Sequence, residues 1–293
     1  MFRIAAIATV CCVLLNACAP PIRLIPSRVK TGLDSVVYAG VVEGAHQVDL
    51  RNARFLAKVK VGDLGVTLDC TYPDALNYAK DVARSIGGNL LVITEHKQYQ
   101  EKSKCHRIKA DIYAVPSLEG VESEIYWHPA RPLLPGDMRG QPAPGNALPR
   151  LHCTFTFRLG GDFFKSVILR SETIFWADSA AKASSPDQVG FTLRRAQIHF
   201  NLAELHARRL KAALAAMGPD LPAITARYRP LLAKQTVEYQ AQSSALEQEL
   251  AAGSANADAV LERWTKQVQQ ELTALEAYFG DQTVVLKKQK KKG

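Results

Sequence analysis

The sequence predicts an α+β protein in two parts, a small α/β layer domain followed by a domain of strands and long helices that ends in a helical hairpin. The length of 293 residues suggests two domains, because one domain commonly spans ~100–200 residues. A composition of 47% hydrophobic and 22% charged residues is typical of globular proteins and excludes wholesale disorder. The apolar periodicity then changes from short β-rich runs in the first half to helical spacings of three and four after residue 185.

The N-terminal segment is typical of a lipoprotein leader. Arg3 precedes an apolar run over residues 4–15, and small residues follow, so a signal peptide is predicted over residues 1–17. Residues 15–18 read Leu-Asn-Ala-Cys and resemble the bacterial lipobox, although Asn is unusual at its position. The resemblance implies that Cys18 becomes the lipidated first residue of the mature chain and anchors it to a membrane. The alternative is an ordinary signal peptide that a chance cysteine follows.

The predicted location is the cell envelope. The lipobox resemblance favours the outer membrane, facing the periplasm, because Ala19 rather than Asp follows the cysteine. Once the leader is removed and Cys18 is lipidated, three cysteines remain in this oxidising compartment, Cys70, Cys105 and Cys153. An odd count allows one disulfide and one free thiol, or no disulfide. The sequence has no C-x-x-C spacing, so a cysteine-based zinc site is not expected.

The first half of the chain predicts a tether and a small domain. Residues 18–35 contain several prolines and little periodicity, which predicts a tether, and residues 36–116 form the small α+β domain. Its β-rich runs are bounded by glycine, as strands are. Between them, Pro73 opens a helical run that Gly87 and Gly88 end. The expected order is strand, strand, helix, strand, strand, over residues 36–42, 55–61, 73–86, 90–94 and 108–115.

This domain resembles a small domain of bacterial lipoproteins that is distantly similar to the outer-membrane lipoprotein sensor of the Rcs envelope-stress pathway. The resemblance covers residues 58–115 and rests mainly on their glycines and cysteines. Paired cysteines in such domains crosslink strands to the helix edge, which implies a Cys70–Cys105 disulfide that contributes about 3–4 kcal/mol. His96 and His106 are expected on strand faces, with metal ligation as the alternative.

The second domain is predicted over residues 117–286, and residues 287–293 form a basic tail. Six prolines make residues 117–150 irregular, although residues 127–133 read as a motif and not merely as a linker. Strands rich in β-branched and aromatic residues follow, over residues 151–159 and 163–176. The lysines of the tail are expected in solvent, with contact to anionic headgroups as the alternative.

Three helices are expected after the strands. From Pro186 to Met217 apolar residues alternate at spacings of four and three, which predicts one long helix with a continuous apolar stripe. Two further helices are predicted over residues 219–250, kinked near Pro230, and 256–279. Gly253 separates them, which predicts an antiparallel hairpin.

The long helix carries a second resemblance. Residues 193–205, read together with residues 127–133, 140–142 and 171–176 upstream, resemble a family of secreted bacterial proteins described as predicted zinc-dependent proteases, domain-of-unknown-function family 922. The helix of that family carries His-Glu-Gln-x-His-Phe, in which the two His bind zinc and the Glu activates water. The resemblance covers residues 121–280 and implies a protease-like fold.

The reactive residues of that motif are missing from this chain. The first zinc-ligand position is Arg195, the catalytic position is Ala196, the second ligand is kept as His199, and a later family His corresponds to Ala252. Arginine cannot coordinate zinc, and alanine cannot deprotonate a bound water. We therefore expect a non-catalytic, pseudo-metalloprotease domain with a binding or structural role, no cofactor, and an unidentified envelope protein as its partner.

The alternative is a zinc-dependent hydrolase with a metal site rebuilt around His199 and His206. Two histidines seven residues apart on a helix are separated by ~10 Å along the axis, which is too far for one metal without help. Without such a site, His199 is expected to be a buried helix-face histidine with a hydrogen-bonded partner. The net charge of +9 falls to +3 once Arg3 and the five tail lysines are left out, so nucleic acid is not expected as a partner.

Overall fold

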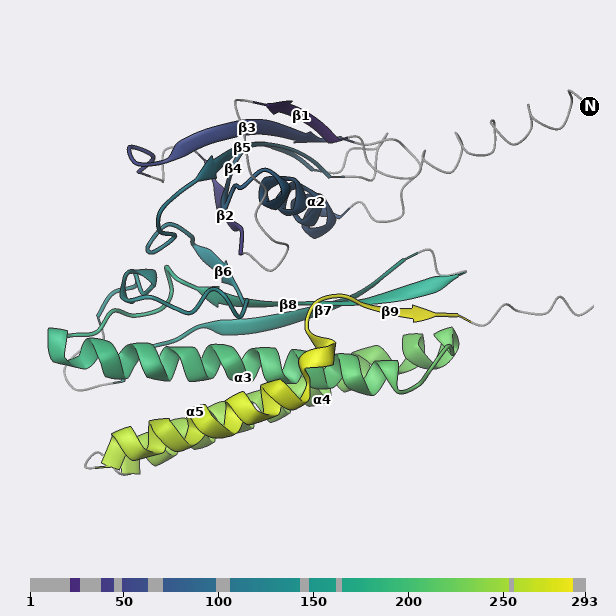
Figure 1. Cartoon of the computed structure of the whole chain (residues 1–293). Helices are drawn as coiled ribbons and strands as arrows, with labels where there is room; N and C mark the ends of the chain where they lie inside the picture. The colour runs from purple at the N-terminus through teal and green to yellow at the C-terminus, as the bar shows by residue number, and fades with distance from the viewer. Residues whose placement is uncertain are drawn as a thin grey trace, which may run out of the picture. The chain divides into compact units, whose positions relative to one another are not determined.

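The computed structural model describes residues 22–26, 38–44, 49–62, 71–98, 106–142, 148–161, 165–252 and 256–286. The predicted α+β class is confirmed, since both sheets and long helices are present (Figure 1). The chain divides into two compact units, Met1–Val121 and Glu122–Gly293. Each unit has a sheet and a hydrophobic core of its own.

The first unit is built on a five-stranded sheet in the order β1-β3-β5-β4-β2. Neighbouring strands are antiparallel except β2 and β4, which run parallel. The bounds are β1 Ile22–Pro26, β2 Gly40–Glu43, β3 Arg54–Val61, β4 Leu90–Lys97 and β5 Arg107–Ala114. The segment predicted as a plain tether therefore includes a strand, and β1 is specified by its pairing with β3 rather than by local periodicity.

Helix α2 (Tyr72–Ser85) has well-defined signals at both ends. Thr71 and Asp74 form a capping box, because each side chain accepts a hydrogen bond from the backbone N–H of the other residue. At the other end Gly87 has φ +82°, and its N–H donates to Arg84 O while Gly88 N–H donates to Ala83 O, as in a Schellman motif. The predicted stop at the two glycines is thus explained by their backbone conformation.

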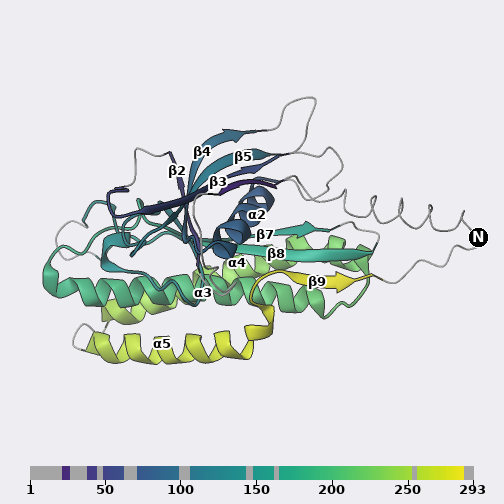
Figure 2. The same cartoon turned by 45° about the horizontal axis from the view of Figure 1, so that its top comes forward.

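One face of the first sheet is covered by α2 (Figure 2). Leu56, Ala79 and Ile112 are among the fully buried residues of this core. A side chain at Gly88 would collide there, since an added Cβ would lie 2.4 Å from Ile112 Cγ2. The same face carries Ile108, and it continues beyond the helix to the ends of β4 and β5.

The second unit has a four-stranded antiparallel sheet in which the long strand β8 pairs with all three others. The bounds are β6 Glu124–Tyr126, β7 Cys153–Gly160, β8 Ser166–Trp176 and β9 Gln282–Val285. Strands β7 and β8 lie where the sequence predicted strands. Strand β9 was not predicted, because only four residues before the lysine tail form it and its pairing partner lies more than a hundred residues earlier.

Three helices complete the second unit, α3 Val189–Ala215, α4 Leu221–Ala252 and α5 Ala257–Ala274. Helix α3 lies between the sheet on one side and α4 and α5 on the other (Figure 1). Ala196, Phe200 and Ala203 pack toward the sheet, whereas Leu202 and Leu205 pack against α4 and α5. Among the described residues no helix combines the length and the apolar character that a membrane span requires.

Candidate functional site

The polar residues of α3 define the candidate site, because this helix is buried almost all round. The predicted single apolar stripe is present, but Ile198, Leu202 and Leu205 form a second apolar face toward α4 and α5. Charged side chains between the two faces cannot reach solvent freely and therefore need partners inside the protein. His199 and Arg195 both fall in this category.

Glu247 on α4 is the common partner of Arg195 and His199. Arg195 Nε and His199 Nε2 donate to the same carboxylate oxygen, Oε1, at 2.8 Å and 2.5 Å. A second donor of the guanidinium, Nη1, reaches the carbonyl oxygen of Pro149 at 2.7 Å. The arginine and the histidine stand one helical turn apart, so one carboxylate can bridge them. His199 is therefore a buried histidine with a hydrogen-bonded partner, as one of the two sequence interpretations expected.

The charge of Glu247 is maintained by this arrangement. Burial by itself would raise the pKa of the carboxyl group, but hydrogen bonds from His199 and Arg195 and the positive charge of Arg195 outweigh burial. The pKa of Glu247 consequently lies below its ordinary value of 4.5. The result is a partly buried ion pair in which the guanidinium of Arg195 stands beside His199.

The four predicted positions of the degenerate metal site do not all come together. Arg195 and His199 meet at Glu247, but Ala196 packs among the apolar residues of α3 that face the sheet. Ala252 is exposed at the end of α4, five residues beyond Glu247 and thus ~7.5 Å further along the axis. The sequence did not single out Glu247, whose only signal is its place next to Leu246 and one turn before Leu250, both of which are buried.

His206 belongs to a different group of residues. Its Nδ1 lies 2.8 Å from Gln235 Oε1 and its Nε2 lies 3.2 Å from Gln242 Oε1, both on α4. Burial lowers the pKa of His206, which favours the neutral ring. Gln235 is fixed by its own hydrogen bond to Glu238, so a neutral His206 carries its proton on Nδ1. His199 and His206 thus bind separate partners, and they are not brought to a common point.

A second buried ion pair on α3 escaped the sequence analysis. Glu204 accepts hydrogen bonds from Arg208 Nε and from Thr173 Oγ1, each at 2.8 Å. The guanidinium of Arg208 also donates to Leu272 O, and it lies over the ring of Trp127 with 4.8 Å between its central carbon and the ring centroid. This group joins α3 to β8 and to the end of α5, so its role is structural.

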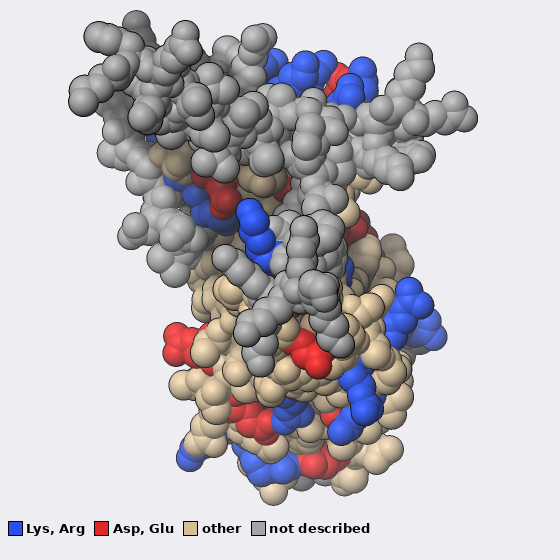
Figure 3. Space-filling model, turned by 90° about the vertical axis from the view of Figure 1, so that its right-hand side faces the viewer, with Lys and Arg blue, Asp and Glu red and all other residues tan. Residues whose placement is uncertain are grey.

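Four arginines of α3 are all ion-paired. Arg195 and Arg208 pair with Glu247 and Glu204, and the more exposed two pair with acidic residues of α5. Those pairs are Arg194–Asp258 and Arg209–Glu271. On the face that Figure 3 shows, Lys and Arg lie interspersed with Asp and Glu among uncharged residues.

The segment over residues 127–133 is an ordered motif attached to α3. Leu133 N–H donates to Gln197 Oε1 at 2.8 Å, and Trp127 Nε1 donates to Asn201 Oδ1 at 2.9 Å. Gln197 also donates to Asn201, which joins the two contacts. The sequence interpretation of this stretch as a motif rather than a linker agrees with these contacts.

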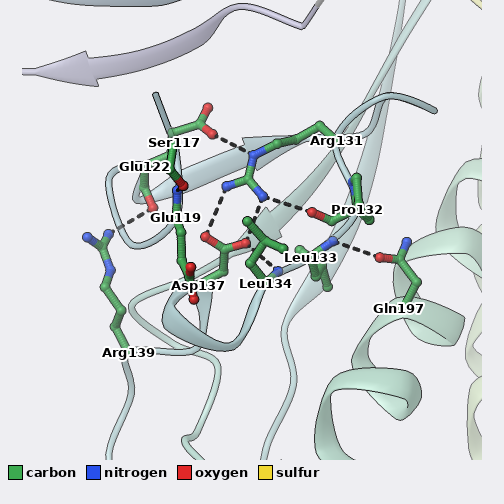
Figure 4. Close-up of polar contacts among 10 residues, drawn as sticks. All are labelled: Ser117, Glu119, Glu122, Arg131, Pro132, Leu133, Leu134, Asp137, Arg139 and Gln197. Atoms are coloured by element: carbon green, nitrogen blue, oxygen red, sulfur yellow. Dashed lines mark hydrogen bonds and ion pairs between the residues drawn. The ribbon is translucent and has the colours of Figure 1, made fainter. Parts of the chain in front are cut away.

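Arg131 fixes the conformation of the same motif (Figure 4). Its guanidinium is 5% exposed and forms a two-pronged contact with Asp137, at 2.8 Å and 2.9 Å, and a third hydrogen bond to Glu122 at 3.2 Å. Asp137 also accepts from Leu134 N–H, and Arg139 donates to the backbone oxygen of Glu122. Both carboxylates are fully buried, so this network fixes the loop rather than presenting a site to solvent.

The predicted cysteine sites lie mostly outside the described residues. Cys18, Cys70 and Cys105 all do, and so do Gly253 and the lysine tail. Cys153 is described, and it is buried. Burial raises the pKa of its thiol far above the ordinary range, which disfavours the reactive thiolate.

Over the ranges that the structure describes, no group of three or more His, Cys, Asp or Glu side chains is placed to hold a metal ion. The chain was compared with known protein families, with curated proteins and with solved structures, and none of the three comparisons finds a match. The two family resemblances noted in the sequence therefore stay predictions.

Proposed function

We propose that this chain is a lipid-anchored protein of the bacterial cell envelope whose second unit is a non-catalytic relative of zinc-dependent proteases. In this proposal the second unit acts through binding or structure, with a second envelope protein as its partner. The leader and Cys18 support the location, with the outer membrane facing the periplasm as the preferred site. Neither a cofactor nor nucleic acid is part of the proposed function.

The observation that carries the non-catalytic assignment is the contact between Arg195 and Glu247. The guanidinium donates to the very carboxylate oxygen that His199 also contacts. A zinc ion bound by His199 at ~2.0 Å would stand next to this fixed positive charge, which repels a dication. The motif position that supplies a zinc ligand in the family thus supplies a cation here, and that cation already neutralises the nearest carboxylate.

The surroundings of the pair support a structural use of the former motif. Ala196 has 0% exposure and packs against the sheet side, so a residue at the position of the family's catalytic Glu would have no access to water. Arg195 in turn ties α3 to α4 through Glu247 and to the preceding loop through Pro149. The helix that carries the catalytic residues in the family joins three parts of this unit.

The proposal is tested by measuring metal and peptidase activity on the same preparations. The purified full chain and its His199→Ala variant are each dialysed against zinc and then analysed for bound metal and for cleavage of unfolded protein substrates. We expect equal zinc content in the two proteins and no cleavage by either. Zinc or peptidase activity that is present in the wild type and lost in His199→Ala would establish the rebuilt zinc hydrolase instead.

A further inference from the structure

Two histidines of the first unit meet at the end of its sheet. His96 is in β4 and pairs with Ile108 of β5, and His106 immediately precedes β5. Side chains alternate between the faces of a strand, so His96, His106 and Ile108 project from the same face. Ile108 is buried under α2, whereas the two histidines lie beyond it and are half-buried.

The ring nitrogens of this pair converge. His96 Nε2 lies 2.8 Å from His106 Nδ1, and the ring centroids are 5.1 Å apart with planes inclined by 27°. Tyr72, the first residue of α2, stacks on His96 with a centroid distance of 4.1 Å and donates its hydroxyl hydrogen to Glu43 at 2.5 Å. The tyrosine therefore holds one side of the pair in place.

A hydrogen bond between two imidazoles contributes little by itself. The contact competes with hydrogen bonds that either ring could make to water, so its net contribution to stability is small. The pairing places two imidazole nitrogens side by side, and imidazole nitrogens are common ligands of transition-metal ions.

We infer that His96 and His106 form a binding site for a divalent transition-metal ion, with Cu²⁺ as the preferred ion. Two nitrogens that bind one ion at ~2.0 Å lie about 2.8–3.3 Å apart, so the hydrogen-bonded nitrogens of the pair, 2.8 Å apart, already stand at a distance that one ion can bridge. The order of affinities for nitrogen ligands favours Cu²⁺ among the divalent ions.

Little rearrangement is needed for binding. When both rings are neutral, one donates a hydrogen bond to the other. To bind an ion, the ring that donates must carry its proton on its distal nitrogen instead, and no net proton is released. The terminal torsion of a histidine is broad, so a turn of each ring redirects both lone pairs toward one ion while the nitrogens stay near their positions. Within the described residues no third His, Cys, Asp or Glu is placed to complete the set.

This inference does not depend on the proposed function of the second unit, because none of its residues belongs to that unit. The matched control is His152, a histidine of the second unit that stacks on Trp176 with a centroid distance of 5.7 Å. A second control is Tyr72→Phe, which keeps the stacking ring but removes the hydroxyl contact to Glu43.

The experiment is a titration of the full chain, purified without a histidine tag, with Cu²⁺, followed by electron paramagnetic resonance. We expect one equivalent bound with hyperfine coupling to two imidazole nitrogens, and an affinity at least about tenfold lower in each of His96→Gln and His106→Gln. His152→Gln and Tyr72→Phe should bind as the wild type does. Circular dichroism checks that each variant is folded. If one of the two histidine variants unfolds, the Cu²⁺ affinity of the other still tests the inference. Absence of binding, or binding unchanged in the folded histidine variants, overturns the inference.

Discussion

Replacing Glu247 by alanine is expected to destabilise the second unit strongly. The change leaves the guanidinium of Arg195, 6% exposed at its side chain, with one neutral partner, the carbonyl of Pro149. Removing one member of a buried ion pair costs 3–5 kcal/mol, and because the Glu247 side chain is 29% exposed we take the lower end, about 3 kcal/mol. For a unit of this size that corresponds to a fall of about 6–12 °C in Tm.

Glu249→Ala is the matched control for that measurement. Glu249 lies on the same helix and pairs with Arg263, but the two side chains are 38% and 56% exposed. An exposed pair contributes about 1 kcal/mol or less, so this variant should lose only a small part of the stability. Adding Arg195→Met to Glu247→Ala should recover most of the loss, because no unpaired buried charge then remains.

The assay is chemical and thermal unfolding of all four proteins, followed by tryptophan fluorescence and circular dichroism. A Glu247→Ala variant that is no less stable than Glu249→Ala would refute the reasoning, since it would mean that the pair is not buried in solution. The pH dependence gives an independent check. The lowered pKa of Glu247 contributes stability above pH 4.5 that is lost as the pH falls through the folded-state pKa, so wild type and Glu247→Ala should converge in acid.

Three further predictions concern metal binding, the anchor and the crosslink. Arg195→His should create a zinc site with His199 and Glu247, because the side chains of residues 195 and 199 already meet at the carboxylate of Glu247. In a His106→Gln background, which removes the histidine pair of the first unit, the Arg195→His variant should bind one zinc ion. Adding Glu247→Ala should abolish this binding, and the control Arg194→His, at an exposed position, should bind no zinc in the second unit. Cys18→Ser should release the protein from membranes, and a variant that still sediments with membranes after a salt wash contradicts the lipobox interpretation. Peptide mapping without reduction should find Cys70 bonded to Cys105 and Cys153 free, and a bond from Cys153 to either one contradicts the assignment.

The sequence predicted those elements whose signals are local. The long helix α3 followed from its apolar spacings, and the end of α2 followed from Gly87 and Gly88, which adopt the conformations that stop a helix. The strands β1 and β9 were missed because pairing with distant strands, rather than their own composition, makes them strands. Local patterns cannot report such pairing.

The candidate site was predicted in part, for a related reason. His199 and Arg195 were identified from the motif, and their spacing of four residues placed them on one face. Glu247, their shared partner, comes from another helix about fifty residues later, so only the packing of α4 against α3 reveals it. Ala252 was carried over by sequence likeness alone, and it lies beyond the contact because α4 continues for more than a turn after Glu247.

The most direct test of the central claim is a comparison of zinc binding by the full chain and its His199→Ala variant, both carrying His106→Gln to remove the first-unit histidine pair. Isothermal titration with zinc is the measurement, and far-UV circular dichroism confirms that both proteins are folded. If Arg195 occupies the place of the first zinc ligand, neither protein should bind zinc in the second unit, and the two titrations should coincide. Stoichiometric binding that disappears with His199 would contradict the account.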